Sequence, residues 1–329
     1  MEFLDRLGLQ RPVVQAGMGG GISTGDLAGA VSAAGGLGTV GLLPDSARMV
    51  AELERARDLA RGRPLAANLL LPFARLEHAA ACVEGGADLV VLFCGSSPRF
   101  VEYLRSAGLL VFQQVGTVDE ARQAIADGVD GLVAQGLEAG GHLLGTEPIR
   151  TFLPKALEVA DGRPVMAAGG VATGAAANAL IEQGAAAVVA GTRFLLTEEC
   201  RAHPGYKRRV LEAEKTLETR LFSVGWPDRH RVVPNAVTDR WCSRSSAGPR
   251  AVVAANRALA PLMRALPSSA ATATLKWQRA GVPFYGPAAA LEGMDDALLD
   301  VTPLYAGECA REIESVITAA QAVELLDPS

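Results

Sequence analysis

The chain has 329 residues and a formal net charge of −5 at pH 7. This acidic balance argues against nucleic acid or an anionic membrane surface as its main partner. Apolar residues make up 49% of the chain, which is enough to bury a large core. None of the apolar runs reaches the roughly 18 residues of a membrane helix without interruption, and the first residues, MEFLDRLGLQRP, lack the apolar stretch of a signal peptide. The sequence therefore predicts a soluble, cytoplasmic protein.

The five cysteines are dispersed along the chain without C-x-x-C spacing. An odd, dispersed set is typical of reduced thiols in a cytosolic protein, and it predicts neither a disulfide framework nor a zinc site. The sequence also lacks a histidine–carboxylate cluster or a carboxylate pair with metal-binding spacing. We therefore expect no bound metal.

Short apolar segments alternate with amphipathic segments from the start of the chain. Most of the apolar segments are four to six residues long and apolar on both faces, as expected for buried parallel strands. The expected strands are Pro12–Ala16, Leu37–Gly41, Leu65–Leu69, Leu89–Phe93, Leu109–Gln114, Gly131–Gln135, Pro164–Ala168 and Ala187–Ala190.

Amphipathic segments fill the gaps between these strands, and several carry helix start signals. Ser96 or Ser97 precedes Pro98, Thr117 is followed three residues later by Glu120, and Thr173 precedes its own helical pattern. The expected helices include Asp45–Leu59, Pro98–Ser106, Val118–Ala126, Thr151–Val159, Gly174–Gln183 and Pro204–Ala213.

Eight strand–helix units in series predict an α/β protein, a closed (β/α)8 TIM barrel. An open, doubly wound sheet is the alternative, and the count of eight disfavours it. The alternation ends near residue 214, and residues 215–290 are rich in Arg, Pro, Trp and Ser. We therefore expect the barrel over residues 1–214 and 291–329, with an inserted, partly helical cap over residues 215–290. A cap helix is expected at Ala251–Leu266, and Leu298–Leu326 is expected to be helical and to return to the barrel.

The active sites of such barrels lie at the C-terminal ends of the strands, and this geometry selects the candidate residues. The loop that follows the first strand, Ala16-Gly17-Met18, continues with three more glycines, which lets its backbone approach a flat ligand closely. A merely flexible turn is the alternative for this loop. Asn68 ends the third strand, where it could hydrogen-bond a ring edge or only cap a turn.

Two glycine turns predict a phosphate site. They follow the seventh and eighth strands, which is the usual phosphate location in these barrels, and backbone N–H groups at such turns bind anions. The residues concerned are Ala168, Gly169, Gly170, Ala190, Gly191 and Thr192.

His142 is the candidate catalytic residue. It follows Gly140 and Gly141 just beyond the sixth strand, in the segment QGLEAGGH, and its near-neutral pKa suits proton abstraction from a weak carbon acid. Gln114 and Gln135, which end strands five and six, are expected to face the same ligand.

The other three histidines are weaker candidates. His78 and His203 are expected to be solvated beside helices, and His230 is expected in a loop of the cap, where it could be a second polar contact.

The ordered segments PVVQAGM, AGAVSAAGGLGTVG, AANLLLP, QGLEAGGH, PVMAAGGVATG and VVAGTRFLLTEE cover most of residues 10–213. In this order they resemble the nitronate monooxygenases, formerly called 2-nitropropane dioxygenases, which overlap in sequence with FMN-dependent bacterial enoyl-ACP reductases. Gly17 stands where that family usually has proline. Leu143-Leu144-Gly145 follows His142, where smaller or polar residues are common.

The resemblance implies one FMN per chain under a cap, and His142 as the catalytic base or orienting residue. The implied reaction oxidises an alkyl nitronate with O₂ to a carbonyl compound and nitrite, without a nicotinamide. The residues implied or expected around the cofactor are Ala16, Gly17, Met18, Asn68, Gln114, Gln135, Gly140, Gly141, Ala168, Gly169, Gly170, Ala190, Gly191 and Thr192.

Three other functions stay open on the sequence. The chain could be an NAD(P)H-dependent flavin reductase of an activated C=C bond, a flavin-dependent tailoring enzyme for a larger substrate, or a phosphate-ligand-binding barrel without flavin chemistry. It carries no clear nicotinamide fingerprint, which favours the oxidase over the reductase. A homodimer is compatible with the sequence, which does not identify the substrate.

Overall fold

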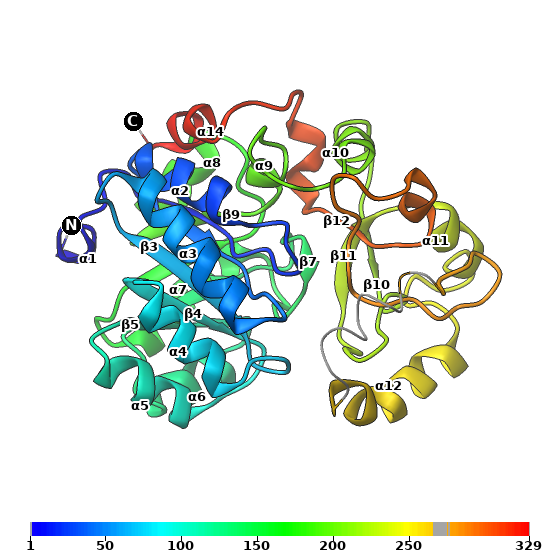
Figure 1. The fold of residues 1–329 in the computed structure, drawn as a ribbon, viewed down its shortest axis with the longest axis horizontal. Helices are drawn as coiled ribbons and strands as arrows, with labels where there is room; N and C mark the ends of the chain where they lie inside the picture. Colours follow the sequence, from blue (N-terminus) through cyan, green and yellow to red (C-terminus); the bar gives the residue numbers. More distant parts are fainter. Residues whose placement is uncertain (1, 266–274, 276, 329) are drawn as a thin grey trace. The chain divides into compact units, whose positions relative to one another are not determined.

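The computed structural model describes residues 2–265, 275 and 277–328, and these residues form two compact units. The first unit comprises Met1–Ala139, Leu144–Cys200 and Ser315–Ser329, and the second comprises Gly140–Leu143 and Arg201–Glu314. Figure 1 traces both units in chain order. None of the described helices is both long enough and apolar enough to cross a membrane.

The first unit is built on eight parallel strands that close into a barrel, so the TIM-barrel prediction is confirmed. The strands follow the spatial order β1-β9-β8-β6-β5-β4-β3-β2. The last gap is closed by Leu37, whose N–H donates to the Val13 carbonyl and whose carbonyl accepts from Gln15 N–H, both at 2.9 Å. The strands are β1 (Val13–Gln15), β2 (Gly38–Val40), β3 (Leu65–Leu70), β4 (Leu89–Phe93), β5 (Leu110–Val115), β6 (Gly131–Gln135), β8 (Val165–Ala168) and β9 (Ala187–Ala190).

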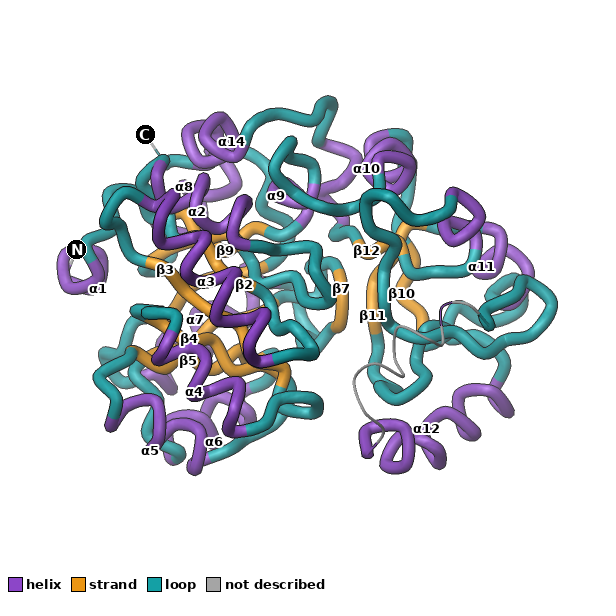
Figure 2. The backbone as a smooth tube through the Cα atoms, in the orientation of Figure 1, coloured by secondary structure: helices purple, strands orange, loops and turns teal. Residues whose placement is uncertain are grey.

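Helices alternate with these strands and cover the barrel, as the orange strands and purple helices of Figure 2 show. Thr117 and Thr173 accept hydrogen bonds from the backbone N–H groups of Glu120 and Ala176, so two of the three predicted start signals act as N-caps. Ser97 precedes α5 without a side-chain cap hydrogen bond. The helices are α2 (Gly25–Ala33), α3 (Ser46–Ala60), α4 (Leu76–Glu84), α5 (Pro98–Ser106), α6 (Val118–Ala126), α7 (Ile149–Ala160), α8 (Gly174–Glu182), the short α9 (Thr192–Leu195) and α14 (Ala319–Leu326).

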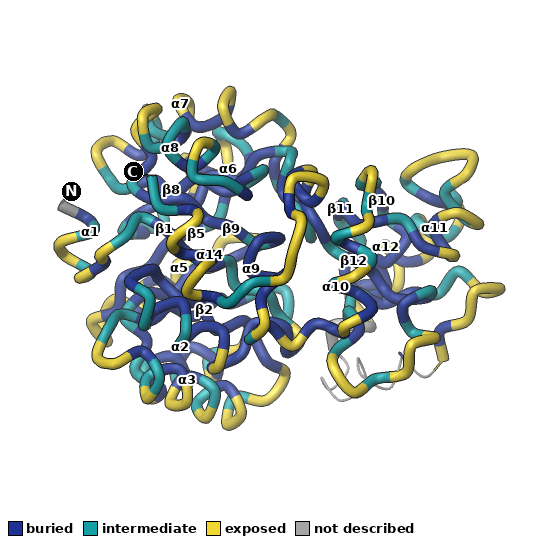
Figure 3. The backbone as a smooth tube through the Cα atoms, turned by 90° about the horizontal axis from the view of Figure 1, so that it is seen from above, coloured by how far each residue is buried: buried dark blue, intermediate teal, exposed yellow. Residues whose placement is uncertain are grey.

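The barrel interior is packed with apolar side chains, and the strands are buried along most of their length (Figure 3). Val14, Phe112, Val133 and Met166 belong to one buried cluster inside the barrel. The N-terminal helix α1 (Glu2–Leu7) packs Phe3 onto this cluster, with the Phe3 and Phe112 ring centroids 5.4 Å apart. Since the starts of the strands are covered in this way, the opposite, C-terminal ends are where a ligand can be held.

The second unit is a small antiparallel sheet with helices. Its strands are β7 (Gly141–His142), β10 (Leu217–Thr219), β11 (His230–Val233) and β12 (Leu304–Tyr305), and β11 pairs with all three others. Its helical segments are α10 (Pro204–Leu211), α11 (Ala236–Trp241), α12 (Arg250–Ala265), η1 (Asp296–Asp300) and η2 (Glu308–Glu312). The predicted cap helix corresponds to α12, and its predicted last residue, Leu266, lies outside the described residues.

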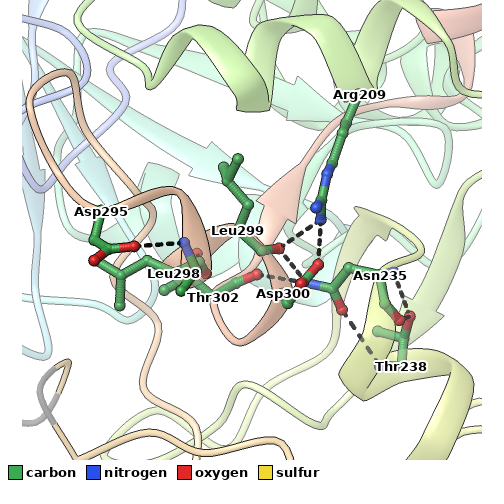
Figure 4. A network of polar contacts seen from close by, with 9 residues as sticks. Arg209, Asn235, Thr238, Asp295, Leu298, Leu299, Asp300 and Thr302 are labelled. Carbon is green, nitrogen blue, oxygen red and sulfur yellow. Dashed lines mark hydrogen bonds and ion pairs between the residues drawn. The ribbon is translucent and has the colours of Figure 1, made fainter.

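The division between the units differs from the sequence prediction, because α10 and residues 291–314 belong to the second unit. A polar network explains this result (Figure 4). Asn235 Nδ2 donates to the carbonyls of Leu299 and Thr302 at 3.0 and 2.9 Å, and Arg209 of α10 bonds both the Leu299 carbonyl (3.0 Å) and the Asp300 carboxylate (2.8 Å). These bonds fasten α10, α11 and η1 to one another.

The predicted helix Leu298–Leu326 is wrong over most of its length. Only Ala319–Leu326 is α-helical, and the rest forms η1, β12, η2 and connecting segments. Pro303 and Gly307 interrupt the pattern, because proline cannot continue a helix ladder and glycine favours other backbone conformations.

Candidate functional site

The C-terminal ends of β1, β9, β8 and β6 are neighbours, and they bring most of the predicted cofactor residues together. The strand order places these four ends side by side. Ala16 N–H donates to the Ala190 carbonyl at 2.9 Å, and Gly136 N–H donates to the Ala168 carbonyl at 2.8 Å. The loops after strands β1, β6, β8 and β9 therefore start from one continuous edge of the barrel.

The turn after β8 depends on glycine. Gly169 and Gly170 have φ angles of +125° and +69°, which side chains rarely adopt. The turn leads directly into α8, whose first residues direct backbone N–H groups toward the same end. A Cβ placed on Gly170 would meet no atom closer than Glu138 Cβ, at 3.5 Å. A Cβ at Gly170 would therefore make ordinary van der Waals contacts without a clash.

The turn after β9 has room of the same kind. Gly191 precedes α9, and a Cβ placed on it would contact only Ala16 Cβ, at 3.7 Å. Because β8 and β9 are adjacent, the two glycine turns lie on neighbouring strands. Two neighbouring sets of backbone amides fit the phosphate of a mononucleotide.

Gly17 is required by the position of Asn68. A Cβ on Gly17 would overlap the Asn68 side chain, and Thr39 Cγ2 lies 3.1 Å away on its other side. Asn68 is buried and donates from Nδ2 to the Val91 carbonyl at 3.1 Å. Gly17 replaces the proline that is usual in the family motif. This replacement agrees with the close contact between the first loop and the end of β3. Met18 follows in the same loop and is partly buried.

Gln114 and Gln135 continue the inward-facing rows of their strands. Phe112 and Val133, two residues before them, belong to the interior cluster, and side chains alternate along a strand. Gln135 is buried, and its Oε1 accepts a hydrogen bond from Leu144 N–H at 2.7 Å. One role of Gln135 is therefore to hold the chain where it re-enters the barrel unit after residue 143.

His142 belongs to the second unit. It forms β7 with Gly141 and lies opposite His230 of β11. Gly141 has φ +76°, and a Cβ on Gly140 would lie 2.5 Å from the carbonyl carbon of Ala306. Both glycines before the histidine are therefore dictated by the backbone path around it.

Three aromatic rings of the second unit surround the His142 imidazole. The Trp226 ring stacks on it with 3.4 Å between centroids and 5° between planes, and His230 and Tyr305 lie at 5.2 and 5.5 Å. Burial lowers the pKa of His142 well below its ordinary value of 6.5, and His230 lowers this pKa further. The imidazole is therefore neutral at pH 7.

His230 was expected in a loop of the cap, and that prediction is wrong, because the residue begins strand β11. It is fully buried in β11, where Nε2 accepts from Phe222 N–H at 3.3 Å and Nδ1 lies 3.1 Å from the Asp228 carbonyl. Only the tautomer with a proton on Nδ1 satisfies both contacts. Burial lowers the pKa of His230 to about 4. The hydrogen bond to the Asp228 carbonyl raises this pKa, and the positive charge of nearby Arg220 lowers it further.

His78 and His203 were expected to be solvated, and both are buried. His78 Nδ1 accepts from Arg75 N–H at 3.0 Å, and His203 Nδ1 accepts from Gly205 N–H at 3.0 Å. Both histidines therefore have structural roles at the starts of helices.

The sequence profile of the nitronate monooxygenase family matches residues 2–85 and 79–327, which is most of the chain. The chain belongs to the nitronate monooxygenase family. It is an enzyme, an oxidoreductase, and the family supports flavin dependence.

Individual relatives of this nitronate monooxygenase family member differ in their named activities. The chain is 32% identical over 251 residues to (3aS,4S,5R,7aS)-5-hydroxy-7a-methyl-1-oxo-octahydro-1H-indene-4-carboxyl-CoA dehydrogenase of Mycobacterium tuberculosis, covering 73% of this chain and 68% of that protein. Nitroalkane oxidase from Streptomyces ansochromogenes has a similar structure, with a TM-score of 0.76, 26% identity and coverage of 99% of this chain and 96% of that one. FabK from Thermotoga maritima is also similar in structure, with a TM-score of 0.75 and 25% identity. The match covers 99% of this chain and 94% of that one.

Sequence reasoning missed two of the three rings around the histidine of this family member. Trp226 lies in the segment GWPDRHRVVPN, to which no role could be assigned, and Tyr305 lies in the segment expected to be helical. The adjacent β-branched residues Val232 and Val233 were one available signal, since His230–Val233 is a strand and is buried throughout. The pairing of β7, β11 and β12 joins residues far apart in sequence, so no local pattern could reveal it.

Proposed function

We propose that this enzyme binds FMN and oxidises an alkyl nitronate with O₂ to a carbonyl compound and nitrite, with His142 as the catalytic base or orienting residue. The observation that carries the proposal is the pair of glycine turns on adjacent strands of a nitronate monooxygenase family barrel. A cytoplasmic location and a homodimer stay predictions from the sequence.

The barrel residues fit a flavin mononucleotide. Backbone amides at Gly169-Gly170 and Gly191-Thr192 would hold the phosphate, helped by the N-terminus of α8. Ala168 and Ala190 end the strands below these turns, and the inward-facing ends of β1, β3, β5 and β6 would contact the ring with Ala16, Gly17, Met18, Asn68, Gln114 and Gln135. Bound FMN would supply the two-electron chemistry that no side chain of this chain offers.

His142 would act as a neutral imidazole. Its lowered pKa keeps one ring nitrogen unprotonated at pH 7, so it can accept a proton from a nitroalkane carbon. The same ring carries an N–H that can donate to an oxygen of a nitronate, which is already deprotonated. The glycines at 140 and 141 would let the backbone place this ring without interference from a neighbouring side chain.

The direct test is nitrite release from propionate 3-nitronate by the purified, flavin-loaded protein under air. We expect nitrite with consumption of O₂ and without NAD(P)H. Under argon, the nitronate should bleach the flavin absorbance, and admission of air should restore it. A flavin that stays oxidised after anaerobic addition of the nitronate would disprove the assignment.

The structural neighbour FabK, an enoyl-ACP reductase, favours one alternative, an NAD(P)H-dependent flavin reductase of an activated C=C bond. Anaerobic mixing with NADH or NADPH separates the two reactions. Rapid bleaching of the flavin by NAD(P)H, with no response to nitronate, would favour the C=C reductase.

A further inference from the structure

The stack between Trp226 and His142 is the most specific contact around the candidate catalytic residue. Its two rings are nearly parallel, and their centroids are 3.4 Å apart. Trp226 and His142 are both buried, with exposed fractions of 4% and 9%. Among the described residues, Trp226 lies outside the apolar cluster formed by Leu221, Phe222, Val232, Val237, Tyr285 and Val301.

The indole is fixed from its own side of the contact. Its Nε1 donates to Asp228 Oδ2 at 2.8 Å, and its backbone N–H donates to the Ser223 carbonyl at 3.0 Å, closing a tight turn. Arg220 Nη1 donates to the Pro227 carbonyl at 2.7 Å, which ties the next residue down. The indole plane therefore does not depend on the imidazole for its position.

The imidazole is fixed by a separate set of contacts. Strand β7 pairs with β11, and the following residue, Leu143, donates its N–H to the Arg229 carbonyl at 2.8 Å. His230 and Tyr305 border the ring at tilted angles of 50°. Contacts of both residues with the segment 226–230 thus bring the two rings face to face.

We infer that Trp226 is a positioning residue for His142: it covers one face of the imidazole and restricts the ring to a single plane. This inference rests on the catalytic role of His142 in the proposed function. Stacked aromatic pairs are stabilised beyond their buried area, and this gain is comparable to the entropic cost of ordering a side chain. The indole can therefore hold one rotamer of the histidine.

The kinetic test compares Trp226→Ala and Trp226→Phe with the wild-type holoenzyme. We expect kcat to fall about 10- to 100-fold in W226A, because a displacement of about 1 Å at a reacting group costs up to about 10²-fold. KM should change less than threefold, flavin content should not change, and W226F should recover most of the rate. Trp277→Ala, at a residue that is 77% exposed, is the matched control and should behave as wild type.

A double-mutant cycle decides whether Trp226 acts through His142. If it does, H142A/W226A should turn over as slowly as H142A alone, because the tryptophan has nothing left to position. Losses that multiply would show that Trp226 acts on substrate or on folding independently, and would overturn the inference.

A readout without turnover separates this inference from the proposed reaction. The chain has four histidines, so labelled imidazole resonances can be assigned by comparison with H142A. In the wild type, the indole should shift the His142 ring resonances upfield, and W226A should remove that shift while W226F keeps part of it. Unchanged His142 resonances in W226A would refute the positioning role, whichever electron donor the enzyme uses.

Discussion

At the scale of single residues, the two histidines of the β7–β11 pair differ in what holds them. His230 has a defined tautomer, because both of its ring nitrogens meet backbone groups. Protonation at Nε2 would point a proton at the Phe222 N–H, which agrees with its pKa of about 4. The His142 ring is stacked on the Trp226 indole. Hydrogen bonding at both ring nitrogens suits His230 to a structural role.

Replacement of His142 tests its proposed role as a base. H142A should keep its flavin, since the glycine turns lie elsewhere in the chain, and should lose about 10²- to 10⁴-fold in turnover of a neutral nitroalkane. His142→Gln is the matched control, because its amide keeps a hydrogen-bond donor but cannot accept the carbon proton. Steady-state nitrite assays with full flavin content would check this. Wild-type rates in H142A would remove the residue from the mechanism.

Burial of neutral His230 should make stability depend on pH. Its folded pKa of about 4 lies below the ordinary 6.5, so between these values the unfolded chain binds more protons than the folded one. The contribution of His230 to the free energy of unfolding is fully present above about pH 6.5. The free energy of unfolding falls by about 3 kcal/mol as the pH approaches 4.

Urea unfolding at pH 7.5, 5.5 and 4.5 would measure this effect in wild type and His230→Gln. The variant should lose less stability over that range, although it starts from a lower value because a buried ring has been removed. H142Q controls for the second buried histidine, which acts in the same direction. An equal pH dependence in wild type and H230Q would contradict the assignment.

At the scale of elements, the sequence predicted what local patterns determine. All eight barrel strands appear where buried apolar runs placed them, and α5 and α6 have the predicted bounds, since Pro98 and Thr117 mark their starts. The glycine turns and His142 were found because strand ends are recognisable. The surroundings of His142 were not found, because β7, β11 and β12 are short and pair over long sequence distances. The buried states of His78 and His203 likewise depend on tertiary contacts.

The turn after β9 provides a test of the phosphate site that is separate from folding. Gly191 has φ −102°, which any residue adopts, and a Cβ there would meet only Ala16 Cβ at 3.7 Å. Gly191→Val should therefore fold with nearly wild-type Tm but bind little FMN, because the side chain would occupy the space proposed for the phosphate. Flavin absorbance per protein and thermal melting would be measured together. The matched control is Gly281→Val, at a glycine with nothing within 4 Å, and full flavin occupancy in G191V would place the phosphate elsewhere.

At the scale of the whole molecule, the chain passes between its two units at residues 139/140, 143/144, 200/201 and 314/315. At 200/201 the chain leaves the barrel unit and at 314/315 it returns, and the barrel segments next to these two points lie side by side. Thr197 forms a parallel bridge with Ile317, Glu198 N–H donates to the Ile317 carbonyl at 3.0 Å, and Ala319 N–H donates to the Glu199 carboxylate at 2.8 Å. The main insertion, Arg201–Glu314, therefore starts and ends at one place on the barrel.

This geometry predicts that the barrel can be separated from the insertion. Replacement of residues 201–314 by a short Gly-Ser linker should leave a folded barrel, because its eight strands, their closure and α14 all lie in the remaining segments. The shortened protein should still bind FMN, since both glycine turns are retained, but it should not turn over nitronate because His142 has lost Trp226, His230 and Tyr305. Circular dichroism, flavin titration and nitrite assays would test the three parts of the prediction. A folded barrel that binds no FMN would show that the turns after β8 and β9 are insufficient, and undiminished turnover would show that the ring cluster around His142 is dispensable.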